Sequence, residues 1–308
     1  MRAEEFLENT SGKTVIFFHN DTDGCASAAM MMKYIKDTEL MSGDVSDDVF
    51  KNLGNDFDRI IFVDYPVDQY LEWFERLKGK DVMVIDHHPI ANDLNKIGFV
   101  HINPRFKEPN KYISCSQVVH KIVTKLGVED TDWIMRVGAV GDAALKGTKN
   151  EKDAVMMIEG FKTFKKAKKL PELVRFMLGC YNVEDFVYSE YRDYMDRLRK
   201  EIENEVIRFE MHGVKEVNFH EIKSRYGIIS VLSNALFEKY PDKTIIIYRE
   251  KDDWYRVSGR STKFDVGATF KKAAEGIGVG GGHVKAGGAH VKDFIIFKEK
   301  VLKLLQSS

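Results

Sequence analysis

Three short apolar runs of this sequence each end in residues that can bind a metal ion. These residues are His19, Asp21 and Asp23 after the first run, Asp64 after the second, and Asp86, His87 and His88 after the third. A further carboxylate, Asp142, lies in the small-residue stretch 138–143. Mixed oxygen and nitrogen ligands suit Mn²⁺ and also accept Mg²⁺, Co²⁺ or Zn²⁺. Because one ion would not need so many groups, the pattern predicts two ions about 3.5–4 Å apart with a bridging carboxylate.

Each of these residues also has an ordinary structural explanation when it is taken alone. Asp and Gly after a strand are common turn residues, which would account for Asp21, Asp23 and Gly24. A strand-end aspartate such as Asp64 often caps the next helix. The metal interpretation is favoured because all of these groups occur at corresponding positions in the chain.

Alternating strand and helix patterns in the first 150 residues indicate how these groups are brought together. We expect strands at 14–18, 59–63, 81–85 and 99–102, and helices at 24–36, 67–77, 114–126 and 131–145. Short continuous apolar strands that alternate with helices predict a parallel sheet covered on both faces. Functional groups of such sheets gather beyond the carboxyl ends of the strands, which is where the acidic and histidine residues lie.

The pattern changes after residue 150. We expect helices at 152–178, 187–209 and 266–274, strands at 228–232, 244–248 and 254–258, and a glycine-rich segment at 276–288. These features predict an α/β protein of two domains, with a parallel-sheet domain at 1–185, a helical linker at 186–212 and a smaller α/β domain at 213–308.

The composition restricts the class of protein. The 47 Lys and Arg residues nearly cancel the 48 Asp and Glu residues, which argues against a protein that coats nucleic acid. The three cysteines form no CxxC pair, so we expect reduced thiols, a cytoplasmic location and no structural zinc. We also expect no membrane partner, because no apolar run approaches the roughly 20 residues of a membrane span. Met30, Met31, Met32 and Cys25 are expected in the core.

Four N-terminal motifs in this order resemble the DHH phosphoesterase superfamily, which is named for the triplet at 86–88. The motifs are HNDTDG at 19–24, VDY at 63–65, DHHP at 86–89 and GAVGDA at 138–143. The stretches SGRS at 258–261 and GGGHVKAGG at 280–288 resemble the DHH-associated domain of that superfamily. The resemblance spans nearly the whole chain. Its layout is most similar to NrnA-like oligoribonucleases, pAp phosphatases and cyclic-dinucleotide phosphodiesterases.

The resemblance implies a role for each site residue of the first domain. Asp21, Asp64 and His19 would hold one Mn²⁺, and Asp23, Asp64, His87 and Asp142 would hold the other. His88 would donate to the phosphoryl group, and Asp86 would orient a ligand histidine. One position departs from the family pattern. In pyrophosphatases and NrnA-like members, a histidine stands four residues before the first aspartate, where this chain has Phe17. His19 has the spacing of an acidic residue in RecJ-type members.

The second domain is expected to hold the substrate. A run of glycines offers backbone N–H groups without side chains, which suits a phosphate, although a flexible loop would look the same. The presence of the SGRS and DHH motifs in the same chain favours phosphate binding over a bare loop. The expected substrate-binding residues are Arg260, Ser261, Gly281, Gly282, His283 and Lys285.

Together these features predict a manganese-dependent phosphodiesterase in which two ions activate a bridging water. Its substrates would be short oligonucleotides or small nucleotides such as dinucleotides, linearised cyclic dinucleotides or pAp, and the resemblance implies nucleoside 5′-monophosphates as products. A RecJ-like single-strand exonuclease is one alternative. A non-catalytic nucleotide-binding partner of a larger nucleic-acid assembly is another, although the intact ligand set argues against it. The oligomeric state stays open, with a homodimer as one option.

Overall fold

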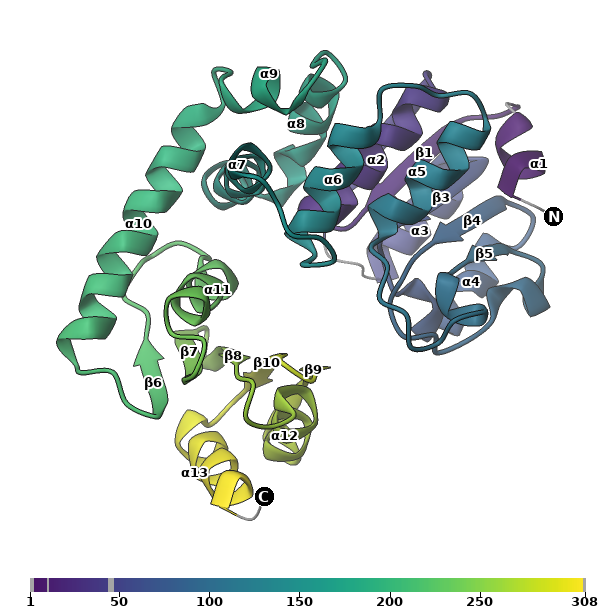
Figure 1. Cartoon of the computed structure of the whole chain (residues 1–308). Helices are drawn as coiled ribbons and strands as arrows, with labels where there is room; N and C mark the ends of the chain where they lie inside the picture. Colours follow the sequence, from purple (N-terminus) through teal and green to yellow (C-terminus); the bar gives the residue numbers. More distant parts are fainter. Residues whose placement is uncertain (1–2, 10, 44–46, 307–308) are drawn as a thin grey trace. The chain divides into compact units, whose positions relative to one another are not determined.

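The computed structural model describes residues 3–9, 11–43 and 47–306 (Figure 1). The chain divides into two compact units between Leu198 and Arg199. This division falls inside helix α10 (Arg192–Met211) and within the expected linker at 186–212. We call residues up to 198 the N-terminal unit and the remainder the C-terminal unit, and describe each by itself.

The N-terminal unit contains a five-stranded parallel sheet with the strand order β2-β1-β3-β4-β5. Its strands are β1 (Thr14–Phe18), β2 (Thr38–Ser42), β3 (Arg59–Val63), β4 (Asp81–Ile85) and β5 (Val100–Ile102). The last residues of three adjacent strands stand in one row, since Phe18 pairs with Val63 and Val63 pairs with Ile85. The residues that follow them in sequence therefore emerge side by side at one edge of the sheet.

Helices cover both faces of this sheet. They are α1 (Ala3–Glu8), α2 (Thr22–Tyr34), α3 (Asp47–Asp56), α4 (Leu71–Phe74), α5 (Cys115–Lys125), α6 (Asp132–Gly141), α7 (Lys149–Lys165), α8 (Leu170–Met177) and α9 (Val183–Val187). Short 3-10 turns lie at Val67–Gln69, Glu75–Leu77, Leu94–Ile97, Pro104–Phe106 and Ala167–Lys169. None of the helices in the described part of the chain combines the length and apolar character needed to cross a membrane.

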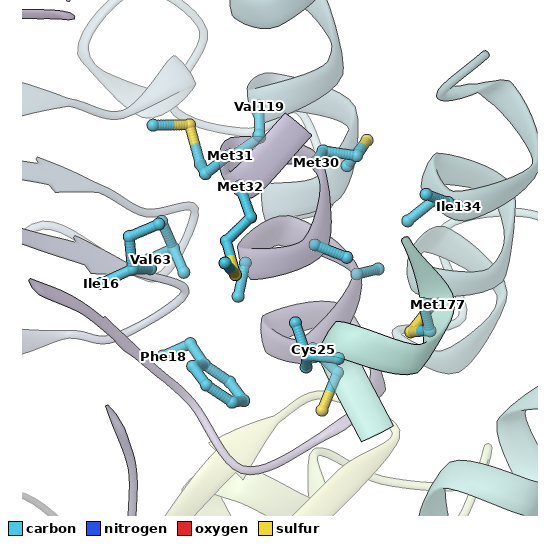
Figure 2. Packing of buried hydrophobic residues seen from close by; sticks show 14 of the residues in the cluster. Ile16, Phe18, Cys25, Met30, Met31, Met32, Val63, Val119, Ile134 and Met177 are labelled. Atoms are coloured by element: carbon cyan, nitrogen blue, oxygen red, sulfur yellow. The ribbon is translucent and has the colours of Figure 1, made fainter. Parts of the chain in front are cut away.

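Alternating side chains of the strands build two separate cores. Val15 and Phe17 of β1 belong to the core on one face, together with Phe50 of α3. Ile16 and Phe18 point to the opposite face and pack with the helices there. In Figure 2 the three consecutive methionines 30–32 and Cys25 of α2 lie among these side chains, which confirms that they are core residues. The rigid packing on both faces positions the strand ends.

The C-terminal unit contains a mixed sheet with the order β6-β7-β8-β10-β9. Its strands are β6 (Val217–Glu221), β7 (Thr244–Lys251), β8 (Trp254–Arg260), β9 (Gly278–His283) and β10 (Ala286–Val291). Its helices are α11 (Ile229–Lys239), α12 (Val266–Ala274) and α13 (Phe294–Gln306). β6 pairs with β7 in parallel, whereas the other pairs are antiparallel. Ile246, Phe270 and Phe297 lie in its core.

Several expected elements differ from the observed ones. The strand expected at 228–232 is wrong, because α11 begins at Ile229. Ile228, Leu232 and Leu236 are all buried, and their spacing of four residues marks one face of a helix. The helix expected at 67–77 is divided into two 3-10 turns and α4, and the one expected at 152–178 is divided into α7 and α8.

Four strands were not predicted from the sequence, namely β9 and β10 in the glycine-rich segment and the strands β2 and β6. β2 reads TELMS and β6 reads VNFHE, and each stands at an edge of its sheet. Edge strands carry polar and charged residues because one side of them faces solvent, so their hydrophobic signal is weak.

Candidate metal centre

The loop between β1 and α2 is built as a tight turn. Asp21 caps α2, and its Oδ1 accepts a hydrogen bond from the Gly24 N–H at 2.9 Å. A Cβ atom at Gly24 would lie 2.2 Å from the carbonyl oxygen of His19, so only glycine fits there. His19 itself contacts Asp21, with 2.7 Å between Nδ1 and Oδ2. The turn thus holds a histidine and a carboxylate together at the end of β1.

Asp64 has two unusual features for a residue at a strand end. Its φ of 60° lies in the left-handed region, which Asp and Asn adopt more readily than most residues. Its side chain is buried, and both carboxylate oxygens have no hydrogen-bond partner among the described residues. The nearest nitrogens are Nε2 of His87 at 3.3 Å and Nδ1 of His19 at 3.6 Å. A buried carboxylate with unused lone pairs is suited to a cation.

Asp23 lies in the first turn of α2 and contacts the start of α5. Its two oxygens accept hydrogen bonds from the backbone N–H groups of Cys115, at 2.7 Å, and Ser116, at 3.0 Å. Backbone N–H groups at a helix N-terminus stabilise negative charge. Burial nevertheless raises the pKa of Asp23 well above its usual value, and the nearby Asp64 and Asp142 carboxylates raise it further.

Asp142 follows the last residue of α6 and lies near His87. Its Oδ2 is 3.7 Å from Nδ1 of His87, a nitrogen that has no hydrogen-bond partner among the described residues. The Tyr112 hydroxyl lies 2.8 Å from the same oxygen and 2.9 Å from the Asp142 carbonyl. Tyr112 also stands edge-on to the His87 ring. Sequence reasoning missed Tyr112, which stands in an irregular loop without a motif.

Asp86 and His88 form a pair, with 2.7 Å between Oδ1 and Nδ1. Asp86 was expected to orient a metal-binding histidine. In the structure it contacts His88, which was expected to face the phosphoryl group and which also lies near Asp64 and His87 as a possible ligand. His87 is held differently, since its carbonyl oxygen accepts a hydrogen bond from Arg105 Nε at 2.8 Å. The Asn103 side-chain amide donates to the His88 carbonyl at 3.0 Å. Asn103 and Arg105 thus position the histidine pair and were also not predicted.

The site residues form three overlapping groups whose ligand atoms lie within 4.8 Å of one another. The groups are His19 with Asp21 and Asp64, Asp64 with His87 and His88, and Asp23 with His87 and Asp142. All six residues expected to bind metal therefore come together. Asp64 and His87 each belong to two of the three groups, so they connect the groups to one another.

The electrostatics of this centre fit divalent cations. Burial raises the pKa of Asp64, and Asp21 raises it further. Burial also raises the pKa of Asp142 to about 6, despite opposing contributions from His87 and Tyr112. Burial lowers the pKa of His87, but its contacts with Asp64 outweigh this and raise the value to about 9. The carboxylates of this centre raise one another's pKa values, and both oxygens of Asp64 lack hydrogen-bond partners among the described residues. A bound divalent cation would stabilise their charged forms, and the residues present would bind it well.

The expected substrate-binding residues lie in the C-terminal unit, and some of them have structural contacts. Arg260 ends β8 and donates from Nε to Oδ1 of Asn234 at 2.7 Å and from Nη1 to the Gly259 carbonyl at 2.8 Å. Burial lowers its pKa to about 10. Ser261 is fully buried, and its hydroxyl lies 2.9 Å from that of Thr244, so its side chain faces the interior.

The glycine-rich segment is a hairpin of β9 and β10 and not the loop expected to present consecutive N–H groups. β9 pairs with β10 along one side, and Gly282 stands opposite Gly287. A Cβ at Gly282 would lie 2.4 Å from the Ala286 carbonyl, whereas one at Gly281 would meet nothing within 4 Å. His283 and Lys285 are exposed at the end of this hairpin. The residues are thus brought to one end of the C-terminal unit, with Gly281 facing open space.

Comparisons with known proteins agree with this architecture. Residues 13–147 match the DHH family N-terminal domain, and residues 214–307 match the DHHA1 domain. No curated protein matches the sequence. Among solved structures, RecJ from Thermus thermophilus in complex with Mn²⁺ has a TM-score of 0.75 at 14% identity, covering 99% of this chain and 53% of that one. This chain therefore spans about half the length of that RecJ.

Two shorter proteins share the fold over nearly their whole length. An exopolyphosphatase-related protein from Bacteroides fragilis has a TM-score of 0.58 at 15% identity, covering 98% of this chain and 96% of that one. The pGpG-specific phosphodiesterase PggH from Vibrio cholerae has a TM-score of 0.59 at 14% identity, covering 96% of this chain and 99% of that one. With the two domain matches and the clustered DHH motifs, this chain belongs to the DHH phosphoesterase superfamily and carries a DHHA1 domain as its C-terminal unit.

Proposed function

We propose that the protein is a phosphodiesterase that uses two Mn²⁺ ions to hydrolyse short oligonucleotides or small nucleotides to nucleoside 5′-monophosphates. The observation that carries this proposal is the shared position of Asp64 and His87 between the groups of ligands. Bound divalent cations would polarise a phosphoryl group and bring the pKa of water near neutrality. Mg²⁺ or Co²⁺ would be substitutes, because carboxylate and imidazole ligands also accept them.

The chain's own residues would divide the remaining work. His19, Asp21, Asp23, Asp64, His87 and Asp142 would hold the cations. His88, whose Nδ1 is engaged by Asp86, would donate a hydrogen bond from Nε2 to the phosphoryl oxygens. The Tyr112 hydroxyl would hold the Asp142 carboxylate in the direction that ligation needs.

The C-terminal unit would bind the part of the substrate that does not react. Arg260 offers a guanidinium with two of its donors already oriented by Asn234 and Gly259. His283, Lys285 and the open face at Gly281 would complete a site for a phosphate or a terminal base. Gly282 would give the strand its shape, and Ser261 would hold the end of β8 through its contact with Thr244. We propose domain limits of 1–185 and 213–308, with 186–212 as the linker.

The names of two similar structures support a nucleotide substrate. RecJ is an exonuclease, and PggH is specific for the dinucleotide pGpG. The family assignment makes phosphoester hydrolysis the common chemistry. A short substrate is favoured by PggH, whose named substrate is the dinucleotide pGpG and which matches this chain over 99% of its own length.

The proposal is tested with the full chain, stripped by chelator and reloaded with Mn²⁺. The substrates are pAp, pGpG, cyclic dinucleotides, and RNA and DNA oligomers of graded length, and products are separated by chromatography. We expect rapid release of nucleoside 5′-monophosphates from the shortest diesters. A rate that rises steadily with length on single-stranded DNA would support the RecJ-like alternative, and activity that persists in chelator would contradict the metal mechanism.

A second experiment separates the roles of the two units. Arg260→Ala and His283→Ala should lose about ten- to a hundredfold in kcat/KM on a dinucleotide, as expected when a charge-assisted hydrogen bond to phosphate is removed. They should bind the same amount of Mn²⁺ as the unmodified chain and lose less on bis(p-nitrophenyl) phosphate. Lys271→Ala, on the exposed face of α12, serves as the control. Equal losses on both substrates would mean that these residues act at the reacting phosphate.

A further inference from the structure

A groove of about 840 Å³ runs along β6 in the C-terminal unit. The end of α10 contributes Arg208 and Met211 to its walls, and α13 contributes Lys298 and Leu302. The side chain of Met211 is 80% exposed, which is unusual for a methionine beside a sheet. None of the groove's residues has a role in the proposed hydrolysis.

The side of β6 that faces the groove is an open sheet edge. β6 is the first strand of its sheet and has β7 as its one neighbour among the described strands. Toward β7, the Glu216 carbonyl accepts from Thr244 N–H at 3.0 Å, and Ile222 N–H donates to the Tyr248 carbonyl at 3.0 Å. Backbone groups alternate in direction along a strand, so those of Val217, Phe219 and Glu221 point away from β7. The edge therefore offers donors and acceptors in alternation.

Positive charge surrounds this edge. Arg208 and Lys223 each have a carboxylate partner, Glu205 at 3.1 Å and Glu221 at 2.7 Å. Lys215 and Lys298 have no carboxylate within ion-pair distance among the described residues. Lys298 instead lies 5.0 Å above the ring of Phe219. The groove thus has two uncompensated ammonium groups beside an open strand.

We propose that this groove binds an extended acidic segment of a partner protein, which adds to the sheet as a strand beside β6. The alternating donors and acceptors fit a peptide backbone, whereas a DNA backbone has acceptors but no donors for the outward carbonyls. A second copy of this chain is disfavoured, because pairing two β6 edges would bring the same lysines together. Met211 and Leu302 would contact apolar side chains of the added strand.

The probe is a fluorescent ten-residue peptide in which valine alternates with glutamate, added to the full chain at low salt. We expect binding with a Kd below about 100 µM that weakens as salt rises. Lys215→Glu/Lys298→Glu should weaken binding by at least about tenfold. The matched control is Lys271→Glu/Lys272→Glu on α12, which should leave it unchanged. Three further probes serve as controls and should bind more weakly than the valine–glutamate peptide. They are a peptide with lysine in place of glutamate, a peptide N-methylated on alternate backbone amides, and a DNA oligomer of equal charge.

Hydrogen exchange distinguishes strand addition from simple charge attraction. Peptide binding should protect the amides of Val217, Phe219 and Glu221, and leave those of Asn218 and His220 at their existing protection. Val217→Pro, which removes an outward N–H at an edge, should abolish peptide binding while hydrolysis of a dinucleotide stays normal. The proposal is overturned if the N-methylated or lysine peptide binds equally well, if the DNA oligomer alone binds, if the chain dimerises through this edge, or if no peptide binds.

Discussion

Replacing Asp64 with asparagine should make the cation-free protein more stable toward unfolding. It should also reduce the stability that the protein gains when Mn²⁺ is added. Asparagine keeps the shape of the side chain and tolerates the left-handed φ of 60°. It removes a buried charge whose two oxygens lack hydrogen bonds. The amide also brings two N–H donors among neighbouring carboxylates, so a repulsive contact becomes a favourable one.

The expected magnitude follows from this environment. Leaving a buried polar or charged group unsatisfied costs about 1–3 kcal/mol or more. In a unit of this size, each kcal/mol shifts the unfolding temperature by about 2–4 °C, so Asp64→Asn should raise it by about 2–12 °C in chelator. Burial and then Asp21 raise the folded-state pKa of Asp64. The penalty is therefore complete above that pKa and absent below the unfolded value of about 3.9, so the gain should shrink as the pH falls from 7.5 toward 4.

The assay is thermal and urea unfolding of both proteins in chelator and in increasing Mn²⁺. The unmodified chain should gain about 2.7 kcal/mol for each bound ion when Mn²⁺ reaches about a hundred times its Kd, and Asp64→Asn should gain much less. Asp81→Asn is the control, since this carboxylate stands at the opposite end of β4. The reasoning fails if Asp64→Asn is less stable than the unmodified chain in chelator, or if it keeps the full response to Mn²⁺.

Three further perturbations test the centre and the packing of the C-terminal unit. Tyr112→Phe removes the hydroxyl that lies 2.8 Å from Asp142 Oδ2. Steady-state kinetics should show a kcat about three- to tenfold lower with KM little changed, and calorimetry should show weaker Mn²⁺ binding. A change in KM alone would mean that Tyr112 binds substrate. Gly267→Ala should destabilise the C-terminal unit by about 1–3 kcal/mol in urea unfolding, because the added Cβ would lie 2.4 Å from the backbone oxygen of Gly282. Gly281→Ala, whose Cβ would meet nothing within 4 Å, should be nearly neutral. Similar destabilisation by both variants would contradict the packing of α12 on β9. Mn²⁺ affinity should rise between pH 6 and 9, because His87, with a pKa of about 9, and Asp142, with a pKa of about 6, must lose their protons to bind the ion. Calorimetry in buffers of different ionisation enthalpy measures the protons that are released. An Mn²⁺ affinity that does not change with pH would exclude both residues as ligands.

The N-terminal sheet illustrates which parts of a fold can be predicted from sequence. β1, β3 and β4 are central strands buried on both faces, so their apolar runs and their bounds were visible in the sequence. The strand β2, and β6 in the C-terminal sheet, escaped prediction because their polar and charged residues leave no apolar run. The edge strand β5 was predicted, at 99–102. The segment that begins α11 was misread as a strand because a short apolar run fits either period until the later residue Leu236 is considered.

The amino-acid sequence alone was enough to show that ligand-type residues follow three strands and that the chain is an α/β protein resembling the DHH superfamily. This was possible because parallel strands need apolar runs, and the chemistry needs carboxylates and imidazoles whose identity cannot vary freely. The folded chain was needed to show that Asp86 holds His88 and that Tyr112 contacts Asp142, because these contacts depend on side-chain directions and on a loop far away in sequence. The strand register likewise places Asp64 between the ligand groups, since a row of paired residues at Phe18, Val63 and Ile85 brings the next residue of each strand to the same edge.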